Sequence, residues 1–108
     1  MNGQNEPQRG EVYAIEGLTW PALVIQNDTG NKYSATTIVA LLTEATSHPY
    51  PFTTPVTTKA SGMPKAGVIN LAFIMTIEKE RLKKKIGKLG ARRMARVDAA
   101  IKVSLALA

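Results

Sequence analysis

The sequence predicts a mainly β fold of the α+β kind, in which a small antiparallel β-barrel or curled sheet is followed by one C-terminal α-helix. Short apolar segments, separated by turn-forming residues, recur from about residue 10 to residue 77. Residues 91–107 instead repeat apolar side chains at helical steps. The length of 108 residues suits a single domain, which we place over residues 9–108 behind a flexible tail of residues 1–8.

The first half of the chain predicts three strands. Residues 10–15 and 21–26 form the first two, and the second is almost wholly apolar, as expected of a buried strand. Residues 27–31 are rich in Asn, Asp and Gly, which predicts a turn. A third strand follows over residues 36–42.

The later strands are less regular. Residues 51–56 contain Pro51 and Pro55, which limit that strand to a sheet edge or an irregular position. The remaining expected elements are a loop at 61–65, a strand at 67–73 whose apolar run continues to 77, and a short strand at 85–89 with Ile86 and Leu89 pointing inwards.

A closing amphipathic helix is predicted over residues 91–107, where it would cover one opening of the barrel. Its first turn carries Arg92 and Arg93, where the helix dipole favours acids. A bound phosphate or plain solvent screening would offset that cost. The apolar face would consist of Met94, Val97, Ile101, Ser104 and Leu105.

Positive charge is concentrated at the end of the chain. The formal net charge is +6. Residues 1–77 hold four basic and five acidic side chains, a net charge of −1, whereas residues 78–108 hold ten basic and three acidic side chains, a net charge of +7. Such segregation attracts polyanions, although many charge runs are simply solvated surface.

Several kinds of site are not expected. The chain lacks cysteine and has one histidine, so we expect no disulfide, no metal site and no cofactor. That histidine, His48, lies in a loop-like run; it is a candidate general base, although exposed loop histidines are more often inert. No apolar run approaches the ~18 residues of a membrane span, so we expect a cytoplasmic protein with no membrane partner.

Two residues stand out beside the central strands. Thr43 follows the third strand where it opens onto a surface loop, and its hydroxyl is placed to meet a ligand. Trp20 precedes Pro21 at the start of the buried second strand. It is either a rim or core anchor or a surface on which a base stacks.

Several short motifs resemble one known family when taken together. They are RGEVY at 9–13, PALVIQND at 21–28, IVALLT at 38–43, GMPKAGVI at 62–69, TIEKERL at 76–82 and KIGKL at 85–89. Their order and spacing, rather than any single motif, resemble the PemK/MazF-type toxins of bacterial toxin–antitoxin pairs.

The resemblance implies an SH3-like barrel that forms a homodimer, cuts single-stranded RNA without a metal, and is silenced by a cognate antitoxin with an acidic or apolar tail. In that chemistry the ribose 2′-hydroxyl attacks the neighbouring phosphate. Family members commonly use a threonine that ends the third strand, which Thr43 matches, and an arginine before the second-strand proline. Trp20 occupies the arginine's position.

Two further segments depart from the family pattern: the first loop is cut to residues 16–19, and the segment at 72–76 has apolar residues before Thr76 where relatives often have polar ones. Three functions therefore stay open. The chain is a sequence-selective endoribonuclease in which another cation, Arg9 or one from the basic segment, replaces the arginine; a catalytically impaired homologue that binds RNA or antitoxin; or a structural subunit. Candidate RNA-binding residues are Arg9, Asn27, Lys83, Lys84, Lys85, Arg92 and Arg93.

Overall fold

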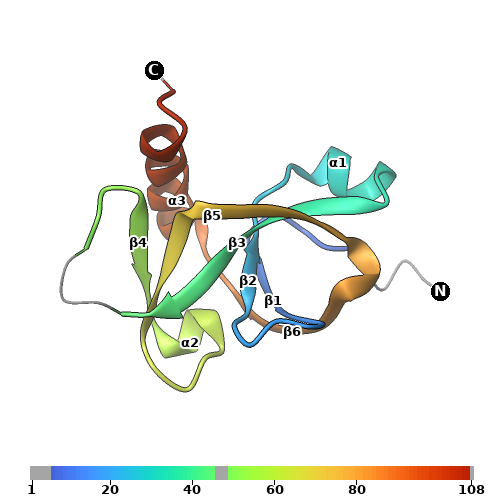
Figure 1. Cartoon of the computed structure of the whole chain (residues 1–108), viewed down its shortest axis with the longest axis horizontal. Helices are drawn as coiled ribbons and strands as arrows, with labels where there is room; N and C mark the ends of the chain where they lie inside the picture. The colour runs from blue at the N-terminus through green and yellow to red at the C-terminus, as the bar shows by residue number, and fades with distance from the viewer. Residues whose placement is uncertain (1–5, 46–48, 108) are drawn as a thin grey trace.

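The computed structural model describes residues 6–45 and 49–107, which are built around one six-stranded antiparallel sheet (Figure 1). The strands are hydrogen-bonded in the order β4-β5-β3-β2-β1-β6. Their bounds are β1 Glu11–Ile15, β2 Ala22–Val24, β3 Thr36–Glu44, β4 Thr53–Val56, β5 Gly67–Glu78 and β6 Leu82–Lys88. The helices are α1 Asp28–Tyr33, α2 Thr58–Ser61, the 3-10 turn η2 Lys79–Arg81, and α3 Ala91–Ser104.

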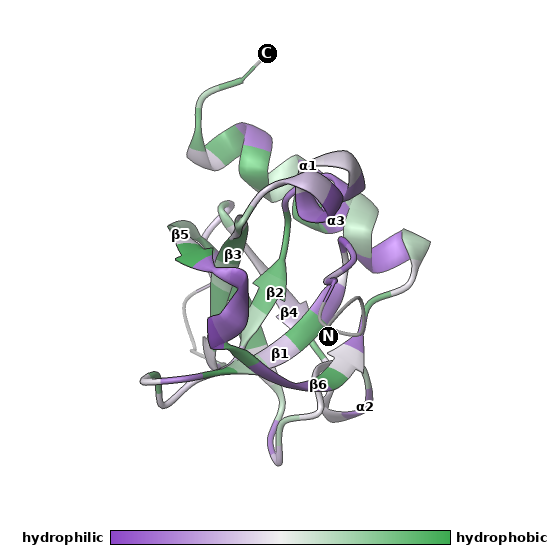
Figure 2. Cartoon of the chain, turned by 90° about the vertical axis from the view of Figure 1, so that its right-hand side faces the viewer, coloured by the Kyte–Doolittle hydropathy of each residue, from purple (hydrophilic) through white to green (hydrophobic). Residues whose placement is uncertain are grey.

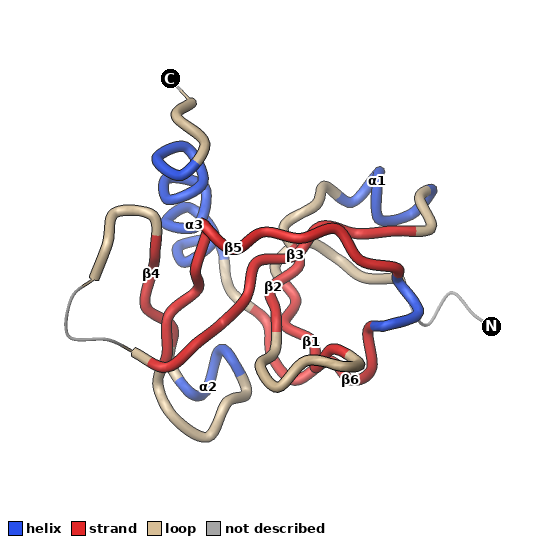
Figure 3. The backbone as a smooth tube through the Cα atoms, in the orientation of Figure 1, coloured by secondary structure: helices blue, strands red, loops and turns tan. Residues whose placement is uncertain are grey.

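The mainly β architecture with a C-terminal helix is confirmed, but the sheet is not closed. β3 and β5 run over one side of the molecule, and the chain turns through η2 into β6 on the other (Figure 3). Among the described residues, β4 and β6 are the two ends of the strand order. β4 has four residues, and Pro55 within it has no N–H to donate to a further strand. The sheet is therefore curled and open rather than a complete barrel.

β5 is a single strand that includes both the predicted strand at 67–73 and the apolar run that continues to residue 77. Its pairing with β3 changes register, because Ala40 lies opposite Ile74 whereas the next residue, Leu41, lies opposite Asn70. The extra residues of β5 form a bulge, which bends the strand. The first part of β5, residues 67–70, lies between β3 and β4 and pairs with both, whereas residues 74–78 pair with β3.

β2 is buried on both faces, which explains its uninterrupted apolar sequence. Leu23 belongs to a core cluster that extends to α3, whereas Ala22 and Val24 belong to a second cluster inside the curl of the sheet. In Figure 2 the ribbon of β2 is correspondingly hydrophobic along its length. Burial of a Leu or Val side chain stabilises the fold by about 1.5–3 kcal/mol.

α3 packs on the part of the sheet formed by β4 and β5. Val97 and Ala100 are buried, Met94 and Ile101 are partly buried, and the hydroxyl of Ser104 donates to the Leu71 carbonyl at 2.7 Å. The predicted helical face is thus confirmed up to Ser104. Leu105 is instead an exposed C-cap, because the helix ends before it completes the next turn.

Two short helices were not predicted from the sequence. Residues 27–31 were expected to form a turn, but the Asn27 side chain accepts a hydrogen bond from the Gly30 N–H and caps α1. In the same way Thr57 caps α2, which ends at Gly62 with a positive φ of 77°. The capping residues Asn and Thr and the closing glycine are the sequence signals for these helices.

Two residues of the predicted N-terminal tail contact the rest of the domain. Pro7 is buried, and the Gln8 N–H donates to the Glu11 carboxylate at 2.8 Å. Residues 1–5 lie outside the described part. No helix in the described ranges is long and apolar enough to cross a membrane.

Candidate functional site

Trp20 and Thr43 lie together at one end of β2. Ala22 pairs with Leu41 in the antiparallel β2–β3 ladder, and the Leu42 N–H donates to the Pro21 carbonyl at 3.0 Å. Continuing this register by one more residue places Trp20 opposite Thr43. The structure therefore brings together the two residues that the sequence analysis connected with catalysis.

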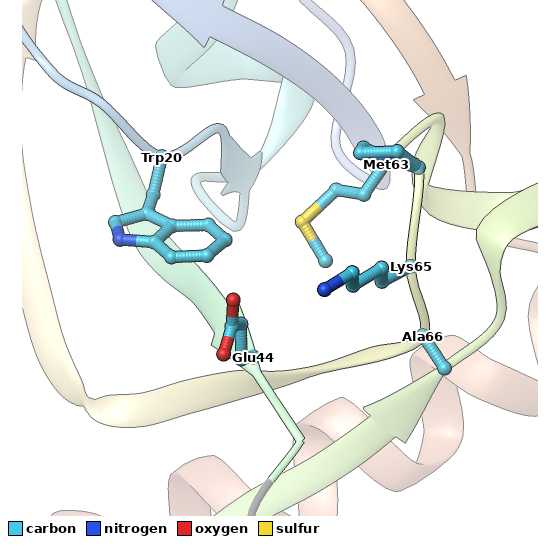
Figure 4. Close-up of a pocket in the computed structure, with 6 residues that line it drawn as sticks. Trp20, Glu44, Met63, Lys65 and Ala66 are labelled. Atoms are coloured by element: carbon cyan, nitrogen blue, oxygen red, sulfur yellow. The ribbon is translucent and has the colours of Figure 1, made fainter.

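A cavity of about 140 Å³ opens beside this pair, and Figure 4 shows its lining. The Trp20 indole, the Glu44 carboxylate and the Lys65 ammonium face the same space. Met63, Pro64 and Ala66 complete its mostly apolar walls. Neither Glu44 nor Lys65 forms an ion pair or side-chain hydrogen bond with another described residue.

The loop of residues 62–66 forms one wall of the cavity, and two glycines hold it in place. A Cβ on Gly62 would clash with the Ile86 carbonyl of β6, and one on Gly67 would clash with both Met63 and the Thr43 carbonyl. Met63 is buried in the main core. This close packing fixes the loop against the ends of β3 and β6.

Arg9 and Asn27 lie at the opposite end of β2, away from Thr43. The Arg9 guanidinium donates to the Ile25 carbonyl at 2.7 Å and forms an ion pair with Asp98 of α3 at 2.6 Å. The Asn27 side chain is occupied by its capping bond. The structure thus separates these two candidates from the cavity, and their expected RNA contacts stay predictions.

The basic candidates of β6 and α3 form a third location. Lys83 pairs with Glu16 at 3.5 Å and Lys85 pairs with Glu11 at 3.2 Å across the β1–β6 edge. Lys84 lies between them on the strand and is exposed. The first turn of α3 carries an exposed Arg92 and a half-buried Arg93. Part of the basic segment therefore stabilises the fold, and its expected role in holding RNA stays a prediction.

Beside β6, Glu11 is the centre of a small polar cluster. Its carboxylate is nearly buried and accepts from the Tyr13 hydroxyl at 2.9 Å, from Lys85, and from the Gln8 N–H. Burial raises the pKa of Tyr13 well above its usual value of 10, and the hydrogen bond and negative charge of Glu11 add to the effect. Tyr13 therefore stays protonated and acts as a donor.

Sequence reasoning missed two residues of the cavity, Glu44 and Lys65. Glu44 directly follows Thr43, and Lys65 lies in the GMPKAGVI motif at 62–69, but neither position identifies its spatial neighbours. His48 lies outside the described residues. Within residues 6–45 and 49–107, no group of three or more His, Asp or Glu side chains is arranged to hold a metal ion.

Comparisons with known proteins agree with this fold and chain length. A family model described as PemK-like, MazF-like toxin of type II toxin-antitoxin system matches residues 7–105. The chain is 38% identical to Endoribonuclease MazF of Staphylococcus epidermidis, with 93% of this chain and 92% of that protein covered. It is 39% identical to Endoribonuclease EndoA of Bacillus subtilis, with 93% and 95% covered.

A solved structure gives the same result in three dimensions. An endoribonuclease in complex with its cognate antitoxin, from a Mycobacterial species, matches with a TM-score of 0.80 and 25% identity, covering 94% of this chain and 97% of that one. The open sheet, its closing helix and these matches define a protein of the toxin fold. More particularly, the chain belongs to the PemK-like, MazF-like family of type II toxins.

Proposed function

We propose that this protein is the toxin of a toxin–antitoxin pair and cuts single-stranded RNA at selected sequences without a metal. The observation that supports this most directly is the cavity that presents Lys65 and Glu44, the residue after Thr43 on β3, beside Trp20. The family and its endoribonuclease relatives supply the reaction class.

In the proposed reaction, the ribose 2′-oxygen bonds to phosphorus while the bond from phosphorus to O5′ breaks. The 2′ proton passes to a base, the leaving O5′ takes a proton from solvent, and a cyclic phosphate remains. The phosphate gains negative charge in the transition state, so donors and cations placed there accelerate the step.

Two side chains of the cavity lining, Lys65 and Glu44, and the neighbouring Thr43 meet these needs. The Thr43 hydroxyl donates to a phosphate oxygen, and the Lys65 ammonium supplies the positive charge that the absent arginine would provide. The Glu44 carboxylate accepts the 2′ proton. Lys65 replaces Arg9 and the basic segment as our candidate cation, because Arg9 is held by Asp98 on the far side of β2.

The test is cleavage of single-stranded RNA by purified protein in EDTA. We expect discrete fragments, and we expect Lys65→Ala to slow their appearance by about 10²–10³-fold, the effect of losing a preorganised donor. Thr43→Ala should act similarly, whereas Lys65→Arg retains the charge. Lys59→Ala, an exposed lysine on α2, is the matched control.

Glu44→Gln keeps the size of the side chain but removes the proposed base, so it should lower the rate of cleavage. Intact RNA at high protein excess would contradict the proposal. Growth arrest on expression without an antitoxin, relieved by Thr43→Ala, tests the same activity in cells.

A second candidate function is favoured by Trp20 itself. Its indole offers one neutral N–H where relatives carry a charged guanidinium, so the chain is alternatively an impaired homologue that binds RNA or antitoxin. RNA cleavage by the Trp20→Arg variant, with none by the unmodified chain, would show that the chain is an impaired homologue.

The proposal includes two protein partners and a location. Exposed apolar side chains of β5 and the end of α3, namely Phe73, Val103, Leu105 and Leu107, suit a homodimer interface. The basic surface suits an antitoxin with an acidic or apolar tail. We place the protein in the cytoplasm, where its RNA substrate is found. Sedimentation of Leu105→Asp against the unmodified chain tests the dimer.

A further inference from the structure

Trp20 lies at the boundary between two cavities. One is the 140 Å³ cavity with Glu44 and Lys65 in its lining. The other, of about 180 Å³, also borders Trp20, Met63 and Pro64 but has no charged side chain in its lining. The indole therefore lies between a cavity lined by uncharged side chains and a cavity that also has two charged side chains in its lining.

The contacts of Trp20 do not fit a core anchor. The side chain is 37% exposed and belongs to neither core cluster. Its indole N–H makes no hydrogen bond with a residue in the described ranges. Tryptophan that only fills space is usually more buried and finds a partner for this N–H. The ring is therefore partly exposed and borders both cavities.

The charged cavity has the size and walls that suit one aromatic ring. An apolar cavity of about 150 Å³ is known to admit benzene, so 140 Å³ accommodates a single six-membered ring. Trp20 provides a flat face for stacking, and Met63, Pro64 and Ala66 provide apolar contact. Lys65, which holds the reacting phosphate in the proposed function, lines the same cavity, so such a ring would lie next to that phosphate.

We propose that Trp20 stacks on a pyrimidine base of the RNA strand, next to the cleaved bond, and that it selects single-ring bases there. The inference rests on the proposed function, in which Lys65 holds the phosphate. A neutral indole does not hold a phosphate, but it binds a base by stacking irrespective of charge. With tryptophan at this position, the side chain would select a base, whereas an arginine there would stabilise negative charge.

The sole tryptophan of the chain gives a direct measurement. We would titrate the unmodified protein with 2′-O-methyl oligonucleotides, which cannot be cut because the attacking hydroxyl is blocked. Stacking of a base on Trp20 should quench its fluorescence saturably. An oligonucleotide of pyrimidines should quench more strongly and at lower concentration than one of purines.

Variants of Trp20 test the energetics. Trp20→Ala should weaken oligonucleotide binding by about 5- to 150-fold, the range measured for loss of one stacking contact. Trp20→Phe keeps an aromatic face and should retain most of the binding, which separates stacking from a folding defect. The control is Tyr33→Ala, which removes an aromatic ring that is 77% exposed on α1, at the other end of β2.

The outcomes separate this inference from the function on which it rests. Cleavage without quenching would overturn the stacking of a base on Trp20 while leaving the endoribonuclease activity standing. Quenching by pyrimidines without any cleavage would support the base site and contradict the catalytic proposal. Equal quenching by purines and pyrimidines would overturn the size selection. A fluorescence change on dilution of the protein alone, with none on adding RNA, would assign Trp20 to contact with a second copy and overturn the inference.

Discussion

The two ends of β2 differ in what their polar side chains do. At the end that carries Arg9 and Asn27, the described polar groups are bonded to one another: the buried Asn31 accepts from Thr37 at 2.6 Å and donates to the Gln26 carbonyl at 3.0 Å. At the Trp20 end, Glu44 and Lys65 line a cavity without an ion pair between them. Both ends are attached to the same three-residue strand.

This difference teaches how to separate structural from functional polar residues in a small domain. A buried polar group must be hydrogen-bonded, and once its bonds are used within the fold it has little left for a ligand. Glu44 and Lys65 differ, because they line an apolar cavity and form no ion pair with another described residue. We therefore expect substitutions at the Arg9 end to change stability and substitutions at the Trp20 end to change activity.

The largest change in the free energy of unfolding is expected in the loop of residues 62–66, which both packs against the core and forms a wall of the cavity. Gly62→Ala forces a side chain into the Ile86 carbonyl at a φ of 77°, and should lower the free energy of unfolding by about 3–4 kcal/mol. Chemical denaturation measures it. Gly90→Ala is the control, because its Cβ meets nothing within 4 Å, and it should cost less than about 1 kcal/mol. Equal costs would show that the loop does not pack as closely as described.

At the Arg9 end, Asn31→Ala should lower the free energy of unfolding by about 2–3 kcal/mol, because its partners are left buried without bonds. Thr29→Ala, an exposed residue of the same short helix, should change it by less than about 0.5 kcal/mol. Thermal or urea unfolding distinguishes the two. A destabilisation no larger than that of the control would remove the basis for calling this end structural.

Two cation substitutions, one at each end of β2, test whether stability and activity depend on different ends. Arg9→Ala should lower the free energy of unfolding by about 1–2 kcal/mol, since it breaks the bond to Ile25 and a partly exposed ion pair. Lys65→Ala should change stability by less than about 0.5 kcal/mol while it slows cleavage. Both variants are measured by urea unfolding and by RNA cleavage in EDTA. If Arg9→Ala instead slows cleavage with its stability unchanged, Arg9 binds RNA and the division between the two ends fails.

Much of the fold could be predicted from the sequence because it depends on local patterns. The apolar run at 21–26 indicated a strand buried on both faces, and Pro51 and Pro55 indicated the sheet edge at which β4 lies. The α1 helix was missed because Asn, Asp and Gly favour turns and helix caps equally well, and only the bond from Gly30 to Asn27 distinguishes them.

The candidate site was harder to predict because it depends on contacts between distant segments. Thr43 and Trp20 could be connected through a family pattern, and their adjacency follows from the β2–β3 register. Lys65 joins them only because glycines at 62 and 67 let a loop approach β3 and β6 closely, which no periodicity in the chain reveals. Charge density directed attention to residues 78–108, yet several of those side chains are paired within the fold.

The smallest expected effect concerns the Glu11 cluster, a third group of bonded polar side chains, and it depends on pH. The pKa of Tyr13 is raised above 10 in the folded protein, so its protonated form is favoured by folding. Its contribution to stability is therefore complete below pH 10 and is lost as the pH rises above 10 towards the raised value. Tyr13→Phe removes one donor to Glu11 and should cost about 1 kcal/mol at pH 8.

Between pH 8 and pH 11 the stability difference between the unmodified chain and Tyr13→Phe should shrink, because only the former loses this contribution. Urea unfolding at each pH measures the difference, with Tyr33→Phe as a control that removes an exposed hydroxyl. A constant difference over that range would mean that Tyr13 ionises alike in the folded and unfolded states, contrary to its burial and its bond to Glu11. A shrinking difference would show that the polar groups between β1 and β6 stabilise the fold, as those at the Arg9 end do. Because Lys85 binds the same Glu11 carboxylate, this conclusion would include part of the basic segment.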